Sequence, residues 1–321
     1  MKAEITRAAE ILRAGGLVAF PTETVYGLGA RADRPEAVAK IFAAKERPNF
    51  DPLIVHAPDL ATAEKYAFFD EMAQELGRRF WPGPLTLVLP RRPVVCDLAT
   101  SGLATVGIRV PAHPLARELL EACGLPIAAP SANRFGYVSP TTAAHVREGL
   151  GDRVEMILDG GPCTVGVEST IVALEGGTAR LLRPGGVPRE AIEAALGQKL
   201  TYGGHQAPVD APQAPGMLKS HYAPTRPVEC FDSLGTLEAR AQELKGDCAL
   251  LGCGLPGEIP AQVREDLGTD AIGMAAGLFA ALRRLDAAPV AAILALLPRP
   301  EGLGLAVRDR LIRASGSRPV R

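Results

Sequence analysis

Two patterns of apolar and polar positions recur along the first 200 residues, one with helical spacing and one of short apolar runs. Apolar residues recur at helical spacing from Ile5 to Leu12, and a glycine pair ends this stripe before an apolar run at 17–20. Helical stripes also occur at 69–80 and 115–123. Short apolar runs typical of buried strands recur at 53–55, 85–89, 105–110, 126–129, 154–158 and 170–174. Because several strands follow one another directly, we predict an α/β (α+β) domain with a mixed sheet.

A connector divides the chain. Residues 201–227 contain five Pro and three Gly without apolar periodicity, which indicates an irregular, semi-extended segment. The remainder alternates between predicted strands at 228–231, 248–251 and 290–294 and predicted helices at 233–244, 271–285 and 303–314. This order is typical of a small Rossmann-like, doubly wound domain. We therefore predict a first domain at 1–200, a linker at 201–227 and a second domain at 228–321.

The second domain contains a literal Gly-x-Gly-x-x-Gly at Gly252, Gly254 and Gly257, directly after a predicted strand. Such a motif binds dinucleotides only when a helix opens immediately after it. Pro256 falls inside the turn and no convincing helix follows, so we interpret the motif as a structural turn.

Composition and charge exclude several classes. The 321 residues are 47% apolar, and the basic and acidic side chains balance in both parts of the chain, 24 to 24 in 1–227 and 11 to 12 in 228–321. This balance argues against strong nucleic-acid binding. The six cysteines are irregularly spaced without a CxxC pair, which indicates buried free thiols. No signal-peptide core or membrane span is evident, so we expect a reduced, cytoplasmic location.

The chemistry-bearing residues collect in loops beside the strands of the first domain. No P-loop occurs, so bound ATP would need scattered residues. PTETVYGLG follows the first strand, and Lys45 and Arg47 stand at the end of a helix, where basic residues are usually solvated. Arg109 lies inside an apolar strand, where a guanidinium needs an anionic partner.

Three further segments add hydroxyl, amide and guanidinium groups. Ser131, Asn133 and Thr141 follow the strand at 126–129, where they are equally suited to capping and to binding a nucleotide. Glu168, Ser169 and Thr170 open one strand, and Arg183 closes the next. Each segment alone is a weak signal.

Taken in order, PTETVYGLG, KERPNFDPLIVH, TVGIRVP, PSANRFGYVSPT, ESTIV and LLRPGG resemble the YrdC-like threonylcarbamoyl-adenylate synthases. The linker segment PGMLKSHYAP and the domain after it resemble the long, two-domain form of that family, so the resemblance covers nearly the whole chain. It implies a twisted mixed-sheet YrdC-like domain with a positively lined cleft. Threonine, bicarbonate and ATP would meet in that cleft.

The resemblance also implies a set of site residues. L-Threonine would contact Thr24, His56, Arg109, Ser131 and Ser169. ATP would contact Arg47, Asp51, Thr105, Asn133, Thr141 and Arg183, and Tyr222 of the linker would close over the nucleotide. Lys45 and Arg47 would act beside the reacting groups. Many relatives have Asn where Asp51 stands, and a carboxylate next to phosphates would repel them unless a magnesium ion intervenes.

The implied reaction makes threonylcarbamoyl-AMP and pyrophosphate from L-threonine, bicarbonate or CO2, and ATP with Mg2+. The product serves threonylcarbamoylation of the adenosine next to the anticodon in tRNAs that read codons beginning with A, through a downstream transferase. One alternative is a double-stranded RNA-binding protein without synthase activity, which the charge balance disfavours. Another is the carbamoyl-transfer module of hydrogenase maturation proteins, but the cysteines and acylphosphatase segment of those proteins are missing here.

The linker admits two interpretations. It is either a passive spacer or a lid that excludes water from a labile mixed anhydride. Lys219, His221 and Tyr222 make it more elaborate than a tether requires, so we predict a lid.

Overall fold

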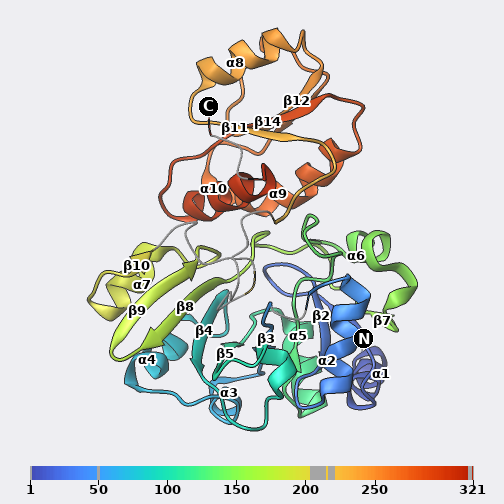
Figure 1. The fold of residues 1–321 in the computed structure, drawn as a ribbon, viewed down its shortest axis with the longest axis vertical. Coiled ribbons are helices and arrows are strands. Elements are labelled where there is room, and N and C mark those ends of the chain that lie inside the picture. The colour runs from blue at the N-terminus through green and yellow to red at the C-terminus, as the bar shows by residue number, and fades with distance from the viewer. Residues whose placement is uncertain (1, 49–50, 203–214, 216–220, 317–319, 321) are drawn as a thin grey trace.

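Two β-sheets organise the chain (Figure 1). The computed structural model describes residues 2–48, 51–202, 215, 221–316 and 320. The first sheet has ten strands and the second has four. The predicted mixed α/β fold followed by a smaller α/β domain is confirmed.

Most elements of the first domain follow the predicted apolar runs and stripes. Its strands are β1 (Val18–Phe20), β2 (Gly27–Arg31), β3 (Ile54–His56), β4 (Leu85–Pro90), β5 (Thr105–Arg109), β6 (Ile127–Ala128), β7 (Met156–Ile157), β8 (Thr170–Glu175), β9 (Thr178–Arg183) and β10 (Thr201–Tyr202). Its helices are α1 (Lys2–Arg13), α2 (Pro35–Lys45), α3 (Leu60–Ala63), α4 (Glu71–Phe80), α5 (Pro114–Cys123), α6 (Ala143–Leu150) and α7 (Arg189–Leu196), with 3-10 turns at Asp97–Thr100 and Gly151–Arg153.

Strand β2 was not predicted, because its sequence, GLGAR, is short and rich in glycine. The structure explains the glycines. A Cβ at Gly29 would meet the Phe20 ring at 2.8 Å, so the close approach of β1 and β2 requires a residue without a side chain. The PTET segment is therefore the connection of a tight antiparallel pair, in which Phe20 lies opposite Gly27.

The ten strands lie in the order β10-β9-β8-β4-β5-β3-β6-β2-β1-β7. Parallel pairs such as β3–β5 and β4–β8 occur beside antiparallel pairs such as β4–β5. The central strands thus come from sequence positions between 54 and 175, and the loops that carry the polar motifs meet around their ends.

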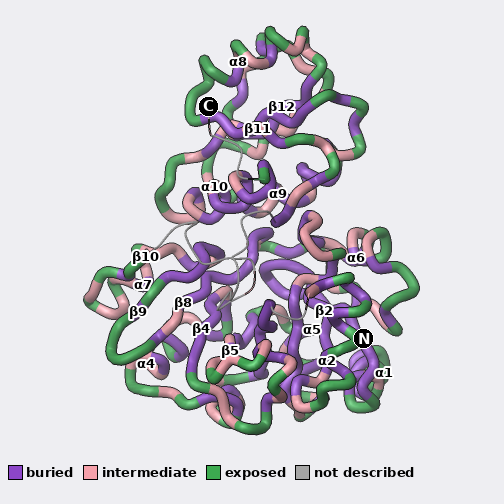
Figure 2. The backbone as a smooth tube through the Cα atoms, viewed as in Figure 1, coloured by how far each residue is buried: buried purple, intermediate pink, exposed green. Residues whose placement is uncertain are grey.

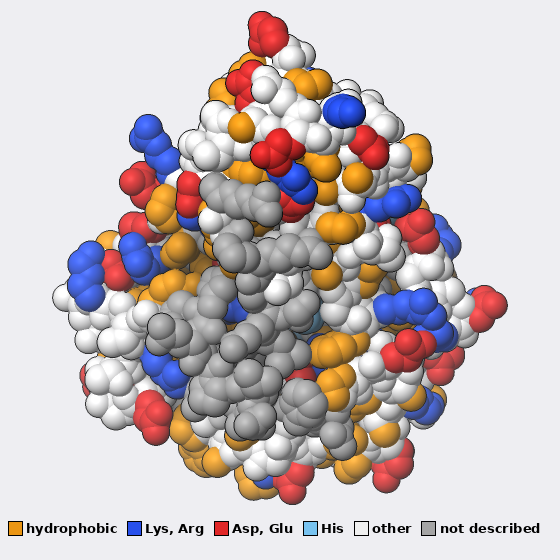
Figure 3. All heavy atoms as spheres, turned by 45° about the horizontal axis from the view of Figure 1, so that its top comes forward, with side chains coloured by type: hydrophobic (Ala, Val, Ile, Leu, Met, Phe, Trp, Pro, Cys, Tyr) orange, Lys and Arg blue, Asp and Glu red, His pale blue; other side chains and the backbone are white. Residues whose placement is uncertain are grey.

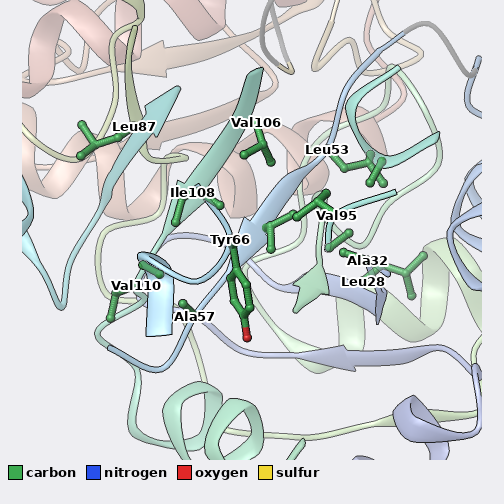
Figure 4. Close-up of a cluster of buried hydrophobic side chains, with 14 of the residues drawn as sticks. Leu28, Ala32, Leu53, Ala57, Tyr66, Leu87, Val95, Val106, Ile108 and Val110 are labelled. Carbon is green, nitrogen blue, oxygen red and sulfur yellow. The ribbon is translucent and has the colours of Figure 1, made fainter. Parts of the chain in front are cut away.

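Apolar side chains pack on both faces of this sheet. On one face, Leu87, Val106 and Ile108 belong to the main core, part of which is shown in Figure 4 together with Tyr66 and Val95. On the other face, α1 and α5 pack against each other and against Val18 and Phe20. Because side chains alternate between the two faces along a strand, Ile54 and Val88 lie on the face opposite to Leu87 and Val106. This face of the central strands carries the polar site.

The second domain is a parallel sheet in the order β11-β14-β12-β13, with helices on both faces. Its elements are β11 (Val228–Phe231), α8 (Leu234–Glu243), β12 (Cys248–Gly252), β13 (Val263–Asp266), α9 (Ala271–Asp286), β14 (Ala292–Leu296) and α10 (Leu303–Ala314). Helices α9 and α10 share one apolar cluster with the strands, and α8 packs in a cluster on the opposite face. The predicted doubly wound domain is confirmed. No helix of the described residues is both long and apolar enough to cross a bilayer.

The glycine motif of the second domain is a turn. Gly252 ends β12, and a turn and then strand β13 follow where a dinucleotide site would need a helix. The backbone N–H groups of Gly254 and Leu255 donate to the carboxylate of Asp266. The structural interpretation of this motif is therefore correct.

The two domains share an apolar cluster. Figure 1 shows α9 and α10 on the side of the second domain that faces the first, and Figure 2 shows buried chain on both sides of this junction. Val25, Val138, Val167 and Tyr222 belong to the same buried cluster as the apolar side chains of α9 and α10. The backbone of Gly166 (φ +77°) lies so near α9 that an added Cβ would meet the Ala275 carbonyl at 2.3 Å. The junction is a close-packed interface.

Candidate active site

A small cavity lies between the first domain and the end of the linker. It encloses about 50 Å³. Its lining comes from all six motifs and the linker: Val25, Arg47, Ile54, His56, Arg109, Ala129, Pro130, Ser131, Glu168, Ser169, Arg183, Pro215, His221 and Tyr222. Seven of the thirteen predicted site residues line it, namely Arg47, His56, Arg109, Ser131, Ser169, Arg183 and Tyr222.

Arg109 and His56 are neighbours on the floor of the cavity. They lie opposite each other on the parallel strands β5 and β3, and both are buried. An Arg109 Nη donates to Glu23 Oε1 at 2.7 Å, so the anionic partner that the sequence required is supplied by the PTET segment. Burial, with Arg109 nearby, lowers the pKa of His56 to about 3, so the imidazole is neutral at physiological pH.

Ser169 and Arg183 form the next part of the wall. Arg183 donates to the Ser169 carbonyl at 3.0 Å and to its hydroxyl at 3.3 Å. The Ser169 hydroxyl also shares a 2.8 Å hydrogen bond with Thr86. Arg183 further donates to the carbonyl of Pro215 in the linker. One guanidinium thus connects the end of β9, the start of β8 and the linker.

Lys45 lies at the end of α2 and is fully buried, so the general expectation of a solvated basic residue fails here. Its ammonium donates to the carbonyls of Ser131 and Asn133, each at 2.6 Å. Burial, together with the charge of Arg47, holds the pKa of Lys45 well below its usual range. In the described structure Lys45 fixes the loop that carries Ser131.

Arg47 points toward the cavity and Asp51 lies behind it. The two side chains form a buried ion pair with 2.8 Å between Nη and Oδ2. Neither carboxylate oxygen of Asp51 makes a hydrogen bond of ordinary geometry. Burial raises the pKa of Asp51, and the positive charges of Arg47, Lys45 and Arg183 act against that shift.

Tyr222 closes the cavity from the linker side. It has a left-handed backbone (φ +63°) and is 1% exposed. Its ring stacks on Phe279 of α9, with centroids 5.6 Å apart, and lies edge-on to His221. Pro215 and His221 also line the cavity, whereas Lys219 lies outside the described residues.

The other six predicted residues do not line the cavity. Lys45 donates to the carbonyl of Ser131 and Asp51 pairs with Arg47, and both of these partners line the cavity. Asn133 accepts from Lys45 and donates to the carbonyls of Arg134 and Tyr137, and Thr24 shares a hydrogen bond with Thr22. Thr105 instead lines a small neighbouring pocket with Thr86 and Gly107. Thr141 is buried and interacts with His145. Their assignment to ATP or threonine stays a prediction.

Buried polar atoms without a hydrogen-bond partner concentrate here. Among the described residues, ten such side-chain atoms belong to Arg47, Asp51, His56, Arg109, Asn133, Arg189, His221, Tyr222 and Arg283. Only Arg189 and Arg283 lie away from the predicted site. Each such atom costs about 1–3 kcal/mol when it has no partner. A polar ligand bound in this region would supply the missing partners.

Sequence reasoning did not single out Glu23 or Arg310. Glu23 stands inside a quoted motif, and its role appears only when β2 brings it beside Arg109. Glu168 was named only as part of its motif, yet it lines the cavity, and Arg310 of α10 donates to it. Arg310 is 142 residues away in sequence, and no local pattern marks it.

The comparisons with known proteins cover the whole chain. A family model described as "Telomere recombination" (Sua5, YciO and YrdC) matches residues 10–185, and one described as "Threonylcarbamoyl-AMP synthase, C-terminal domain" matches 187–316. The threonylcarbamoyl-AMP synthase of Bacillus subtilis is 44% identical over 328 residues, which span 99% of this chain and 94% of that protein.

A solved structure and a shorter relative complete the comparison. The crystal structure of P. abyssi Sua5 complexed with L-threonine is similar with a TM-score of 0.93 and 43% identity, covering 100% of this chain and 96% of that one. A relative from Mycobacterium tuberculosis is 42% identical over 194 residues, which span 60% of this chain and 89% of the relative. The match thus covers most of that relative but only part of this chain.

Proposed function

The chain belongs to the YrdC-like threonylcarbamoyl-AMP synthase family and is an enzyme of the nucleotidyltransferase type, and from this membership we propose its reaction. It joins L-threonine, bicarbonate or CO2, and ATP into threonylcarbamoyl-AMP and pyrophosphate. Within the structure, the single observation that carries this proposal is the concentration of buried polar atoms without a hydrogen bond around one cavity. Arg47, Arg109 and Arg183 line this cavity, and Glu168 is the only lining carboxylate among the described residues, so these side chains favour an anionic ligand.

Each ligand group has a matching side chain in this proposal. The threonine carboxylate binds at Arg109, whose Nε has no partner in the described structure, with the hydroxyls of Ser131 and Ser169 nearby in the lining. The neutral His56 offers a free Nδ1 to a ligand N–H or O–H group. Arg47 and Arg183 face the triphosphate, because guanidinium groups bind phosphate oxygens in a bidentate manner.

The reaction needs no protein nucleophile. The threonine amine adds to CO2 and loses a proton, which gives a carbamate. A carbamate oxygen then bonds to the α-phosphorus of ATP, and the bond from that phosphorus to the pyrophosphate oxygen breaks. Arg47 and Arg183 stabilise the charge on the phosphoryl oxygens, so the protein contributes through position and electrostatics.

Magnesium would enter with ATP. Mg2+ in nucleotide sites is bound through one or two carboxylates together with the substrate phosphates. Asp51 would be the carboxylate to reach such an ion, because its oxygens make no hydrogen bond and pair only with the Arg47 guanidinium in the described structure, whereas the oxygens of Glu23 and Glu168 accept several hydrogen bonds. When bound, the ion would neutralise phosphate charge beside Asp51.

The described cavity is too small to hold ATP and threonine together. Its volume of about 50 Å³ is far below the roughly 300–1,000 Å³ of small-molecule sites. Pro215, His221 and Tyr222 cover it, and Arg183 holds the Pro215 carbonyl. Entry of ATP therefore requires these linker residues to move, which supports the lid interpretation.

We place the enzyme in the cytoplasm, upstream of the transferase that modifies tRNA. The six cysteines are free, which fits a reducing compartment. The RNA-binding alternative lacks support on the face shown in Figure 3, where basic and acidic side chains are interspersed.

Pyrophosphate release by the full chain tests the proposal. We expect release only when ATP, L-threonine and bicarbonate are all present. Chromatography with mass detection should find one threonylcarbamoyl-AMP per pyrophosphate, with D-threonine as the negative control. Equal release without threonine or without bicarbonate would refute the proposal, and salt-sensitive RNA binding in place of turnover would favour the alternative.

A further inference from the structure

Arg310 connects the second domain to the wall of the cavity. It lies on α10 and is 0% exposed. Its Nε donates to Glu168 Oε2 at 2.7 Å, and one Nη donates to the Pro184 carbonyl at 3.0 Å. In the sequence, Glu168 directly precedes Ser169 and Pro184 directly follows Arg183. One planar guanidinium therefore fixes the positions next to two cavity residues.

The acceptors transmit this constraint to the cavity. The backbone carbonyl of Glu168 accepts from the Gly186 N–H at 3.0 Å. The carboxylate oxygen of Glu168 that does not bind Arg310, Oε1, accepts from the Ser139 hydroxyl at 2.6 Å. At Gly185 the two segments approach so closely that an added Cβ would meet the Glu168 carbonyl at 2.3 Å. The start of β8 and the start of the loop after β9 are thus packed against each other, and Arg310 donates a hydrogen bond to each of them.

Other contacts fix Arg310 itself. Its second Nη donates to Asp309 Oδ2 at 2.6 Å, and Asp309 also accepts from Arg313. The guanidinium carbon lies 5.1 Å from the centroid of the Tyr222 ring. The Arg313 carbonyl accepts from the N–H of His221 at 3.4 Å. Helix α10 therefore contacts the first domain and the linker at the same place.

Domain docking alone does not require this arginine. The apolar cluster shared by the domains and the contact of Arg283 with the Val138 carbonyl already join them. A buried charge adds little stability compared with apolar packing, because its desolvation opposes its attraction to a partner. What a guanidinium adds is a fixed geometry for two acceptors at once.

We propose that Arg310 is a positioning residue of the synthase site, supplied by the second domain, which orients Ser169 and Arg183 through Glu168 and the Pro184 carbonyl. This inference rests on the proposed function and deepens it. The second domain then orients the cavity wall through Arg310, while Pro215, His221 and Tyr222 of the linker line the cavity itself.

Steady-state kinetics of the full chain test the proposal. Arg310→Met should lower kcat about 100-fold at saturating ATP and threonine, because misplacement by about 1 Å costs that much. Arg310→Lys keeps the positive charge but cannot donate to two acceptors in the fixed geometry of a guanidinium, so its kcat should lie between those of Arg310→Met and the unmodified enzyme. The matched control is Arg284→Met on α9, since Arg284 is exposed and pairs with Glu265 inside the second domain.

A double-mutant cycle separates positioning from general destabilisation. If Arg310 acts through Glu168, adding Glu168→Gln to Arg310→Met should change kcat far less than Glu168→Gln does alone. Circular dichroism at the assay temperature shows whether each variant is folded. A folded Arg310→Met enzyme with the kcat of the Arg284→Met control would overturn the proposal.

Hydrogen exchange provides a readout that does not depend on catalysis. Arg310→Met should accelerate amide exchange in peptides that cover 168–171 and 184–188, and Arg284→Met should not. If the unmodified chain releases no pyrophosphate, the proposed function fails and exchange alone decides the role of Arg310. Unchanged exchange in both peptides would then reject it.

Discussion

Arg109 donates a hydrogen bond to Glu23 across the sheet, from strand β5 to the segment between β1 and β2. Glu23 also accepts from the backbone N–H of Ala112 through its other oxygen. The pair is buried, so removal of either group would leave the other as a buried charge without its counter-ion. It also presets the direction of the guanidinium, which leaves Nε without a partner for a ligand to use.

Arg109→Ala should raise the KM for threonine about 10- to 100-fold and leave the KM for ATP nearly unchanged. The reason is the loss of a charge-assisted hydrogen bond to the amino-acid carboxylate, worth about 1.5–3 kcal/mol. Pyrophosphate assays at varied threonine and ATP measure both constants. Because Arg109→Ala leaves the buried Glu23 without its ionic partner, both KM values should also be measured for Arg109→Ala in a protein that already carries Glu23→Gln. A larger effect on ATP than on threonine would contradict the assignment.

The pH dependence of stability should reveal the neutral state of His56. The unfolded chain binds a proton at this histidine below about pH 6.5, whereas the folded protein binds it only near pH 3. Unfolding therefore takes up a proton in this window, and stability falls as the pH falls through it. From pH 7 to pH 5 the loss is about 2 kcal/mol.

His56→Gln removes this titration, so its melting temperature should fall less between pH 7 and pH 5 than that of the unmodified protein. Only the difference between the two pH values is compared, because the substitution also changes packing. His113, His145 and His221, whose pKa values burial also lowers, are present in both proteins, so their contributions cancel in the comparison. Identical pH dependence in the two proteins would show that His56 is protonated as readily when folded as when unfolded.

Gly185→Ala should abolish activity and lower the melting temperature strongly, since the new Cβ would meet backbone atoms of residues 168–170 at 2.3–2.4 Å. The matched control is Gly149→Ala in helix α6, where nothing lies within 4 Å of the added Cβ. There the alanine should be neutral or stabilise the protein by about 0.5–1 kcal/mol. Thermal melts of the two variants measure the contrast, and equal melting temperatures would argue against a tight junction between β8 and β9.

Tyr222→Ala should weaken ATP binding without unfolding the protein, because Tyr222 covers the cavity and stacks on Phe279. Isothermal titration with ATP measures the loss, and Phe279→Leu tests whether the stacking contributes. A chain without residues 201–321 should fold and show little synthase activity. Full activity in both the truncated chain and Tyr222→Ala would reduce the linker to a tether.

The sequence predicted the strands with continuous apolar character and the helices of the second domain, because these elements are buried on one or both faces. It did not predict β13 (Val263–Asp266), because three of its four residues are charged and all are incompletely buried at the sheet edge. It also gave no sign that Lys45 would be buried, since the two carbonyls that accept its hydrogen bonds lie 86 and 88 residues away.

The candidate site shows the same division. The motifs identified which segments meet, and seven predicted residues do line one cavity. The pairs that orient them, Glu23 with Arg109 and Glu168 with Arg310, join residues separated by 86 and 142 positions. Such partners follow from the topology of the sheets and from domain docking, which local patterns do not encode.

The apolar cluster shared by the domains has a consequence for synthesis. Val167 leaves the ribosome more than 100 residues before Ala275 of α9, an interval of roughly 5–20 s at ordinary translation rates. During that time Val25, Val138 and Val167 have no partner helix, and the nascent first domain presents an apolar patch to solvent. The half-made chain is therefore the form most exposed to aggregation, and slow translation of residues 228–321 would lower the yield of enzyme without altering the finished protein.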